Sequence, residues 1–280
     1  MWFLAKNKEW SSCVAGLRNE FTMRALQSGL VRVAGRVWRE KFLHTTPILA
    51  RAVDMSKYDP TQVQFLDADM CIVVDEDDKE VRPASKRETH AISAEEPVAL
   101  LHRAFSVFLF NSEGAMLLQQ RAPEKILFPN RWTNTCCSHP LWNESELPTT
   151  DALGVRNAAV RKLEHELGIS NMSVEDFHFN GRVHYAAPNC ADWGEHEVDY
   201  LLFATKDVTV DPNPNEVSAH RYITPDELRA ELEAHDADYF SPWFRKIAEA
   251  GLLFPAWEAW EQERRCIHAK PEIIRLGVDE

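Results

Sequence analysis

The chain has 280 residues, of which 45% are hydrophobic and 27% are charged, proportions that are ordinary for one or two globular domains. No run of about 18 apolar residues occurs, so the sequence predicts no membrane-spanning helix. The net charge of −13 argues against a general nucleic-acid binder, because such proteins present a basic surface to phosphate. Six cysteines without a Cys-x-x-Cys pair favour a reducing compartment and no disulfide framework.

The first 53 residues differ from the rest in charge, with nine Lys or Arg against three acidic residues. Their net charge is therefore +6, and the remainder carries −19. Residues 23–50 can form a basic amphipathic helix that contains a Thr-Thr-Pro break, which resembles an organelle transit peptide. We predict a basic extension over residues 1–54, favouring a mitochondrial over a cytoplasmic location, and one folded domain over residues 55–280. The alternative is a loose extension upstream of a start at Met55.

From about Asp59 onward, short apolar runs separated by turn residues predict several strands. Residues 70–75 (Met-Cys-Ile-Val-Val-Asp) fit a buried strand. Residues 104–110 and 115–120 fit the two strands of a hairpin around an Asn-Ser-Glu-Gly turn. Residues 182–205 contain two further strand-like runs, at 182–186 and 197–205.

Helices are predicted where apolar side chains recur every three or four residues, as they do over residues 151–167. The Thr-Thr pair at 149–150 supplies candidate N-caps, and Gly168 is a candidate stop. Thr224 opens a second helix with a capping box and a proline at the first position. Ser-Pro-Trp at 241–243 opens a last, Trp-rich helix in the same way. This mixture of strands and helices favours an α/β or α+β sandwich.

The stretch Trp-Thr-Asn-Thr-Cys-Cys-Ser-His-Pro, which ends at residue 140, places a thiol two residues from an imidazole. Side chains at i and i+2 of an extended segment point the same way, so Cys137 and His139 would face one cavity while Cys136 faces away. Glu195 and Glu197 repeat this spacing with two carboxylates. Together these groups suggest a metal-supported acid–base site.

Two further histidines, His90 and His102, lie in separate segments beside apolar sequence. If they converge with His139 and the two glutamates, three nitrogens and two oxygens would suit an octahedral divalent ion such as Mg, Mn or Zn. Two carboxylates that face one space also repel each other unless one is protonated or a cation lies between them. The sequence leaves open whether the segments converge, or whether each histidine is structural and Glu195 and Glu197 mark a solvated strand end.

The end of the helix predicted over residues 151–167 reads Arg-Lys-Leu-Glu-His-Glu-Leu-Gly, counting Gly168. It is similar to the tail of a Nudix box, Arg-Glu-x-x-Glu-Glu-x-Gly, whose glutamates bind the metal for diphosphate hydrolysis. Lys162 and His165 stand where two of these glutamates would be, and only Glu166 remains. The pattern therefore favours the Nudix fold but not its usual hydrolysis. Lys162 and Glu166 are four residues apart and can form an ion pair on one helix face.

A group of basic residues, Lys86, Arg121 and Lys125, lies close in sequence to the histidine and cysteine segments. In so acidic a chain this group is a candidate clamp for a diphosphate, although each residue alone could be ordinary surface charge. Trp243 stands at the start of the last predicted helix. Its indole face could stabilise a developing cation, and the alternative is a place in the core.

Taken together, these motifs resemble those of the type I isopentenyl-diphosphate isomerase family over residues 63–260. The segments that carry the resemblance are residues 86–90, 102–105, 120–125, 133–140, 164–168, 193–197 and 241–243. The Cys-containing motif and the Gly-Glu-His-Glu motif are highly specific as a pair. The resemblance implies a Nudix-like α/β/α sandwich with a mixed β-sheet and added N- and C-terminal elements.

The resemblance also implies the reaction, the interconversion of isopentenyl diphosphate and dimethylallyl diphosphate through a tertiary carbocation in isoprenoid biosynthesis. It implies that Cys137 and Glu197 are the catalytic groups, that Tyr185 relays a proton near Glu197, and that Trp243 faces the cation. The implied ligands are His90, His102, His139, Glu195 and Glu197 for one divalent metal, Glu166 for a second Mg²⁺ brought by the diphosphate, and Lys86, Arg121 and Lys125 for the phosphate oxygens. Position 162 is often Arg in the family, and Lys162 keeps its charge without the bidentate fork.

We therefore expect an enzyme that acts as a monomer on a small-molecule diphosphate, with no nucleic-acid or membrane partner. Three other functions are less well supported by the sequence. A Nudix diphosphohydrolase is disfavoured by the missing glutamates, and an inactive binding protein by the presence of both Cys137 and Glu197. A thiol hydrolase that uses Cys137 with His139 is disfavoured because no Asn or Asp is evident to orient the imidazole.

Overall fold

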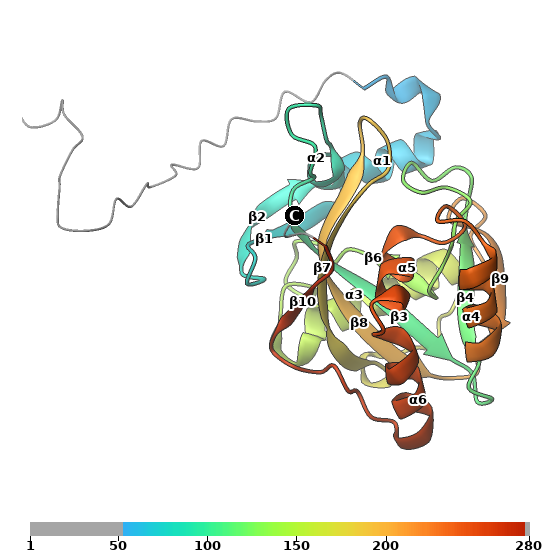
Figure 1. Cartoon of the computed structure of the whole chain (residues 1–280). Helices are drawn as coiled ribbons and strands as arrows, with labels where there is room; N and C mark the ends of the chain where they lie inside the picture. Colours follow the sequence, from blue (N-terminus) through green and yellow to red (C-terminus); the bar gives the residue numbers. More distant parts are fainter. Residues whose placement is uncertain (1–52, 278–280) are drawn as a thin grey trace, which may run out of the picture. The chain divides into compact units, whose positions relative to one another are not determined.

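The computed structural model describes residues 53–277 of the chain (Figure 1). The division into an extension over residues 1–54 and a domain over residues 55–280 stays a prediction, since nearly all of the extension lies outside the described residues. Within residues 53–277, no helix is long and apolar enough to cross a membrane.

The strands of the described part form one mixed sheet. They are β1 (Met70–Val74), β2 (Glu80–Ser85), β3 (His102–Phe110), β4 (Met116–Arg121), β5 (Trp132–Thr133), β6 (Cys136–Ser138), β7 (His178–Pro188), β8 (Gly194–Thr205), β9 (Val217–Ile223) and β10 (Ile273–Arg275). The main path runs β10-β7-β8-β3-β1-β2, while β4 links β3 to β5 and β9, and β6 pairs with β3. Strand β3 lies parallel to β8 and antiparallel to β6, so it forms the centre of the sheet.

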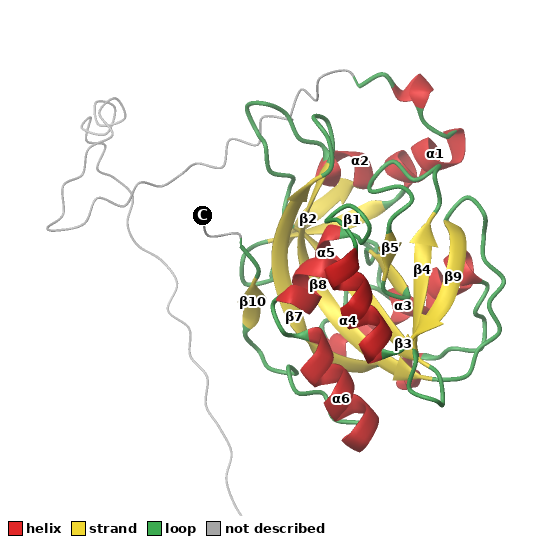
Figure 2. Ribbon diagram, turned by 45° about the vertical axis from the view of Figure 1, so that its right-hand side comes forward, coloured by secondary structure: helices red, strands yellow, loops and turns green. Residues whose placement is uncertain are grey.

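Helices cover both faces of this sheet (Figures 1 and 2). They are α1 (Pro60–Ala68), α2 (Lys86–His90), α3 (Leu153–Leu167), α4 (Pro225–Ala234), α5 (Pro242–Glu249) and α6 (Leu253–Glu263), with short 3-10 turns η1 (Met55–Lys57), η2 (Thr150–Ala152) and η3 (Val174–Asp176). One hydrophobic cluster packs α3 against one face, and the other packs α5 and α6 against the opposite face. This is the α/β/α sandwich with a mixed sheet that the sequence predicted.

Strand β3 shows why the two central strands read as continuous apolar runs. Phe105 and Val107 belong to the cluster on the α3 side, whereas Phe108 and Phe110 belong to the cluster on the α5 and α6 side. Every residue of β3 is buried, because successive side chains enter alternate layers and both layers are filled. The neighbouring β8 follows the same alternation, and its carboxylates at Glu195, Glu197 and Asp199 also lie in the interior.

The strand and hairpin predictions are confirmed by β1, β3, β4, β7 and β8. The predicted N-cap of the helix over residues 151–167 is wrong, because α3 begins at Leu153 and its N-cap, Ala152, makes no side-chain cap bond. The chain enters α3 through left-handed conformations at Asp151 and Ala152, and the Gly154 amide donates to the Pro148 carbonyl at 2.7 Å. The Pro148 carbonyl therefore accepts the hydrogen bond that a threonine side chain was expected to accept. Gly168 ends α3 at φ +65°, as predicted.

The C-terminal helical region also differs from its prediction. The capping box at Thr224 is confirmed, but the Ser241 hydroxyl lies 2.7 Å from the Thr133 hydroxyl and does not cap α5. The helix that opens at residue 242 is not the last, because Gly251, at φ +72°, separates α5 from α6. The short segment around Ser241 is thereby tied to β5, which brings Trp243 against the sheet.

Candidate active site

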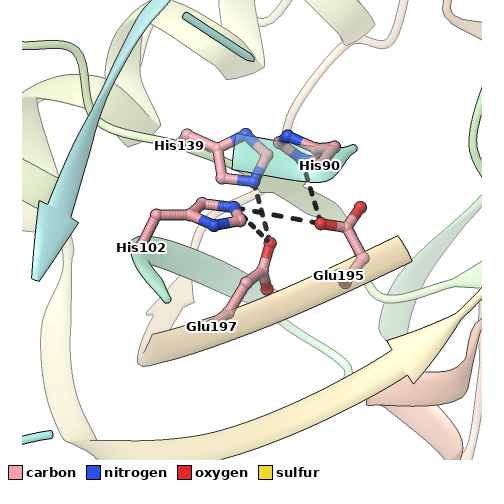
Figure 3. A group of neighbouring side chains, drawn as sticks. All are labelled: His90, His102, His139, Glu195 and Glu197. Atoms are coloured by element: carbon pink, nitrogen blue, oxygen red, sulfur yellow. Dashed lines mark hydrogen bonds and ion pairs between the residues drawn. The ribbon is translucent and has the colours of Figure 1, made fainter. Parts of the chain in front are cut away.

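The polar centre of the molecule is built on the register of three neighbouring strands. Glu195 and Glu197 project from the same side of β8, as their spacing predicted (Figure 3). His102 at the start of β3 lies directly opposite Glu197 in the parallel pair, and Tyr185 of β7 lies opposite Glu197 in the antiparallel pair. One carboxylate is therefore flanked by an imidazole and a phenol from adjacent strands.

Two further imidazoles reach this centre from outside the three strands. His90 ends α2, whose start is capped by the Ser85 hydroxyl, and His139 follows directly after β6. One ligand atom from each of His90, His102, His139, Glu195 and Glu197 lies within 4.8 Å of all the others, and all five residues are buried. Segments that are far apart in the sequence thus converge on one point (Figure 3).

The hydrogen bonds of two histidines fix which ring nitrogen faces this point. Nδ1 of His90 and Nδ1 of His102 each lie 2.7 Å from a main-chain carbonyl, of Lys86 and Leu100 respectively. A carbonyl only accepts, so Nδ1 carries the proton and Nε2 presents a lone pair. His90 Nε2 lies 3.0 Å from Glu195 Oε2, yet both atoms, like His102 Nε2, are buried without a hydrogen-bond partner. Buried acceptors that face one another in this way fit a bound cation.

The electrostatics of the centre agree with that fit. Burial, reinforced by the nearby His90, lowers the pKa of His102 to about 3. Burial and the other two imidazoles likewise hold the pKa of His139 well below its usual value, so both rings are neutral and able to act as ligands. Burial, with the Glu195 and Asp199 carboxylates beside it, raises the pKa of Glu197. The buried His/Glu group could therefore hold a divalent metal.

Glu197 is also held from two sides by hydrogen bonds. His139 Nε2 lies 2.8 Å from its Oε1, and the Tyr185 hydroxyl donates to its Oε2. The phenol is almost completely buried, and burial together with the Glu197 carboxylate raises its pKa. The orientation of this carboxyl is consequently fixed within the pocket.

A thiol and an indole line the same pocket as Glu197. Burial raises the pKa of Cys137 to about 12, although the Arg121 guanidinium, whose Nη1 lies 3.8 Å from Sγ, acts in the opposite direction. The indole of Trp243 donates to the Asn134 side chain at 3.1 Å, and its ring centroid lies 5.3 Å from Cζ of Arg121. The thiol is therefore protonated at neutral pH and lies in an aromatic, cation-lined part of the pocket.

The other end of the pocket is strongly charged. Four cations line it: Lys86, Arg121, Lys125 and Lys162. Two carboxylates accompany them, with Lys125 Nζ 2.5 Å from Glu216 and Lys162 Nζ 3.0 Å from Glu166. The pocket thus combines a His/Glu group that could hold a metal, a protonated thiol and an end where four cations gather, which suits an anionic substrate.

Comparisons with known proteins agree with this combination. The NUDIX domain model matches residues 100–244 of the chain. The isopentenyl-diphosphate delta-isomerase of Gibberella zeae is 49% identical over 209 residues, which cover 73% of this chain and 81% of that protein. The Bos taurus isopentenyl-diphosphate delta-isomerase 1 is 47% identical over 210 residues, which cover 74% of this chain and 91% of that protein. The chain belongs to the isopentenyl-diphosphate delta-isomerase family.

Among solved structures, one from Deinococcus radiodurans aligns with a TM-score of 0.45 and 20% sequence identity over 64% of this chain and 98% of that protein. Membership of this family explains the degenerate Nudix box. In this chain α3 keeps its position in the sandwich, although most of the box's metal-binding glutamates are absent. Glu166, the one that remains, accepts from Gln119 Nε2 at 3.2 Å and pairs with Lys162.

Most residues that the sequence singled out for the isomerase site line this one pocket: Lys86, Arg121, Lys125, Cys137, His139, Glu166, Tyr185, Glu195, Glu197 and Trp243. His90 and His102 lie behind them as members of the His/Glu group. Cys136, as expected, faces away from Cys137 into the cluster on the α3 side. The ion pair between Lys162 and Glu166 forms as predicted, and both residues are buried.

Several pocket residues escaped the sequence analysis, among them Glu216 and Gln62. Glu216 follows an Asn-Pro-Asn turn ahead of β9, and Gln62 lies in the first turn of α1. Both side chains are buried and both line the pocket. Neither sits in a pattern that distinguishes it from an ordinary loop or helix-surface residue, so no sequence pattern pointed to them.

Proposed function

We propose that Cys137 and Glu197 move the proton in this protein. As a member of its family, the protein is an isomerase that interconverts isopentenyl diphosphate and dimethylallyl diphosphate. The observation that carries the assignment of roles is the setting of Glu197. Its carboxyl is fixed by His139 and Tyr185 within a buried His/Glu group, and it shares a pocket with a protonated thiol. An acid and a base held in one enclosed space are what a proton shift between two carbons requires.

The proposed reaction consists of one proton addition and one proton removal. One group donates a proton to the terminal carbon of the alkene, which leaves a tertiary carbocation at C3. The other removes a proton from C2, and the electrons of that C–H bond form the new double bond. No proton is gained or lost overall, so the two groups must exchange their protonation states before the next turnover. We assign the relay of that proton to Tyr185, whose hydroxyl donates to Glu197.

The carbocation needs a surrounding that stabilises it without supplying a nucleophile. The Trp243 indole, packed edge-to-face on Phe128 with ring centroids 5.6 Å apart, offers an electron-rich face. Leu66, Ile126 and Leu127 also line the pocket and exclude water from it. We assign Trp243 to the cation and these apolar side chains to the protection of the intermediate from hydration.

A divalent metal would be held by His90, His102, His139, Glu195 and Glu197, and the unpartnered buried atoms of His90, His102 and Glu195 fit it. Bound there, Mg²⁺, Mn²⁺ or Zn²⁺ would supply positive charge that lowers the pKa of the shared carboxyl. We also propose that Glu166 takes up a second Mg²⁺ that arrives with the diphosphate, in exchange for its present pairing with Lys162. The donor set suits any of these three ions, and the second Mg²⁺ is proposed from the resemblance to the family.

The substrate is a small diphosphate, and we assign its phosphate oxygens to Lys86, Arg121 and Lys125, all of which line the pocket. Arg121 has a second task, because its Nε and Nη2 donate to the main-chain carbonyls of Leu127 and Phe128. Only its Nη1 edge is directed toward Cys137. Arg121 would therefore join the diphosphate end of the substrate to the thiol.

Solvent hydrogen exchange tests the proposed function. Purified protein with Mg²⁺ and isopentenyl diphosphate in deuterated water is followed by ¹H and ³¹P NMR. We expect dimethylallyl diphosphate to form with deuterium at the positions that the proton shift exchanges, and no orthophosphate. Release of orthophosphate without alkene movement would instead identify a hydrolase, and no change in either spectrum would refute the assignment.

The basic extension is a separate proposal. We infer that residues 1–54 direct the protein to mitochondria, with a cytoplasmic location as the alternative, because their excess of Lys and Arg contrasts with the acidic remainder. We further propose that the protein acts as a monomer without a nucleic-acid or membrane partner.

A further inference from the structure

Glu216 connects two parts of the molecule that meet at the charged end of the pocket. Only 3% of the residue is exposed, and its two carboxylate oxygens have different partners. Oε2 accepts from Lys125 Nζ at 2.5 Å, and Oε1 accepts from Gln62 Nε2 at 3.1 Å. Although burial alone would raise it, the ammonium groups of Lys125 and Lys162 hold the pKa of Glu216 below its usual value. The residue is therefore a buried anion whose two oxygens face two separate elements.

On one side, Glu216 defines where the ammonium of Lys125 lies. Lys125 follows β4 in a turn that is itself bonded to Glu216, since the Ala122 amide donates to the Glu216 carbonyl at 3.0 Å. Its long side chain is about 10% exposed and lies close to two other cations, Lys86 and Arg121, which repel it. A flexible lysine among like charges would turn outward without a counter-ion. The carboxylate holds one of its three N–H donors and leaves two for a ligand in the pocket.

On the other side, Glu216 and its neighbour Asn215 hold helix α1. The Gln62 side-chain amide also donates to Asn215 Oδ1 at 2.7 Å, and Asn215 Nδ2 donates to Asp59 Oδ1 at 3.1 Å. The same Asp59 oxygen caps the start of α1. Residues Gln62, Phe65 and Leu66 of this helix line the pocket, although α1 precedes the residues matched by the NUDIX domain model. Helix α1 is thus an added wall of the pocket, fastened through Glu216.

We infer that Glu216 is a positioning residue for diphosphate recognition, which holds the Lys125 ammonium in the pocket and anchors α1 beside it through Gln62. The inference rests on the proposed function, since it takes the anion that meets Lys125 to be the substrate diphosphate. Glu216 acts through its two partners and does not touch the reacting carbons. Its loss should therefore weaken binding of the diphosphate and leave the chemical step largely intact.

A double-mutant cycle on pyrophosphate affinity tests this inference. Inorganic pyrophosphate with Mg²⁺ is titrated by calorimetry into the full chain and into Glu216→Gln, Lys125→Met and the double variant. We expect each single change to weaken binding about tenfold, by loss of a charge-assisted bond, and the double variant to bind no more weakly than Lys125→Met. Independent losses that multiply to about a hundredfold, or an unchanged affinity in Glu216→Gln, would overturn the inference.

Steady-state kinetics and hydrogen exchange separate positioning from a general structural role. In Glu216→Gln, KM for isopentenyl diphosphate should rise about tenfold while kcat stays within about threefold. Gln62→Ala should speed amide exchange in residues 60–68 and leave exchange in β3 unchanged. The matched control is Glu231→Gln, which breaks a partly buried ion pair with Arg221 outside the pocket and should change neither KM nor pyrophosphate affinity. An equal fall in kcat in Glu216→Gln would assign Glu216 to the chemistry and contradict the inference.

Misfolding of the variant and a lack of turnover can both be told apart from a failure of the inference. If Glu216→Gln does not fold, Glu216→Asp takes its place, since it keeps the charge but draws it back by one methylene, and an unchanged pyrophosphate affinity there would overturn the inference. Pyrophosphate binding is measured without turnover. A chain that failed to isomerise its substrate would therefore refute the proposed function, and the cycle would still decide whether Glu216 positions Lys125.

Discussion

Tyr185 and Glu197 lie directly opposite each other in the antiparallel pair of β7 and β8, and the buried phenol donates its hydrogen to Oε2 of the carboxylate. The same register places His102 of β3 on the other side of Glu197. The orientation of the central carboxyl is therefore set by strand pairing, before any ligand is considered. This relationship can be tested by removing a single oxygen atom.

Tyr185→Phe should lower kcat about 10- to 100-fold, because Glu197 loses the donor that orients it and relays its proton. The matched control is Tyr200→Phe, which removes another phenol hydroxyl that donates to a buried carboxylate, that of Asp78, outside the pocket. Both variants should lose about 1 kcal/mol of unfolding free energy in urea, and only Tyr185→Phe should lose activity. Equal activity in the two variants would show that the Tyr185 hydroxyl is structural.

Glu197→Gln should reduce turnover by more than about a thousandfold, because the amide can neither give nor take the proton at this position. The fold should persist, since the amide keeps the size of the carboxyl and can still bond to Tyr185. Far-UV circular dichroism and a thermal melt check the fold, and the deuterium exchange assay checks the chemistry. Turnover within about tenfold of the unaltered protein would rule out the acid–base role.

Metal dependence is tested at His102, which is fully buried and directs Nε2 at the His/Glu group. His102→Ala should lower the affinity for Mn²⁺, measured by calorimetry, at least about tenfold, because one of five ligands is lost. His220→Ala is the control, since His220 lies on β9 and is not one of the five proposed ligands. Treatment with a chelator should abolish turnover of the unaltered protein, and added Mg²⁺ or Mn²⁺ should restore it. Full activity after exhaustive chelation would contradict a metal-supported site.

The sequence could predict the kinds of residues in the site but not how they meet. The i, i+2 spacings of Cys137 with His139 and of Glu195 with Glu197 follow from strand geometry alone. Their meeting with His90 depends on a five-residue helix, α2, that is too short to show a periodicity. It also depends on the parallel register of β3 with β8, which a single sequence does not encode locally. The resemblance to a known family, and not the pattern, supplied the expectation that these segments converge.

Each failure of prediction has an identifiable structural cause. The threonines at 149–150 have the right chemistry for a cap, but the Pro148 main-chain carbonyl accepts the hydrogen bond from the start of α3 instead. Carbonyl O of Glu146 would lie only 2.1 Å from a side chain at Gly154, so this glycine permits the close approach. Glu216 was missed because its partners, Lys125 and Gln62, are 91 and 154 residues away in the chain. Contacts over such separations exist only once the sheet has formed.

The protonation of Cys137 gives a pH-dependent prediction. Because burial raises the pKa of its thiol to about 12, the reactive thiolate is a small fraction at pH 8 and grows about tenfold with each pH unit up to that value. Cys190, which is exposed, serves as an internal control in the same chain. Iodoacetamide followed by mass spectrometry should therefore label Cys190 well before Cys137 at pH 8, with a gap that narrows as pH rises. Faster labelling of Cys137 at pH 8 would mean that the thiol is ionised in the native protein.

The basic extension provides a prediction that is independent of the pocket. Deleting residues 1–54 should leave kcat and KM within about twofold of the full chain, because every proposed site residue lies beyond residue 54. In cells, a fluorescent fusion of the full chain should enter mitochondria, and the deletion variant should stay in the cytoplasm. The matched control replaces Arg24, Arg32, Arg36 and Arg39 by Gln, which keeps the length of the extension and lowers its net charge by four. Import of that variant at the normal rate would show that the positive charge does not carry the signal, and cytoplasmic full-length protein would refute the targeting role altogether.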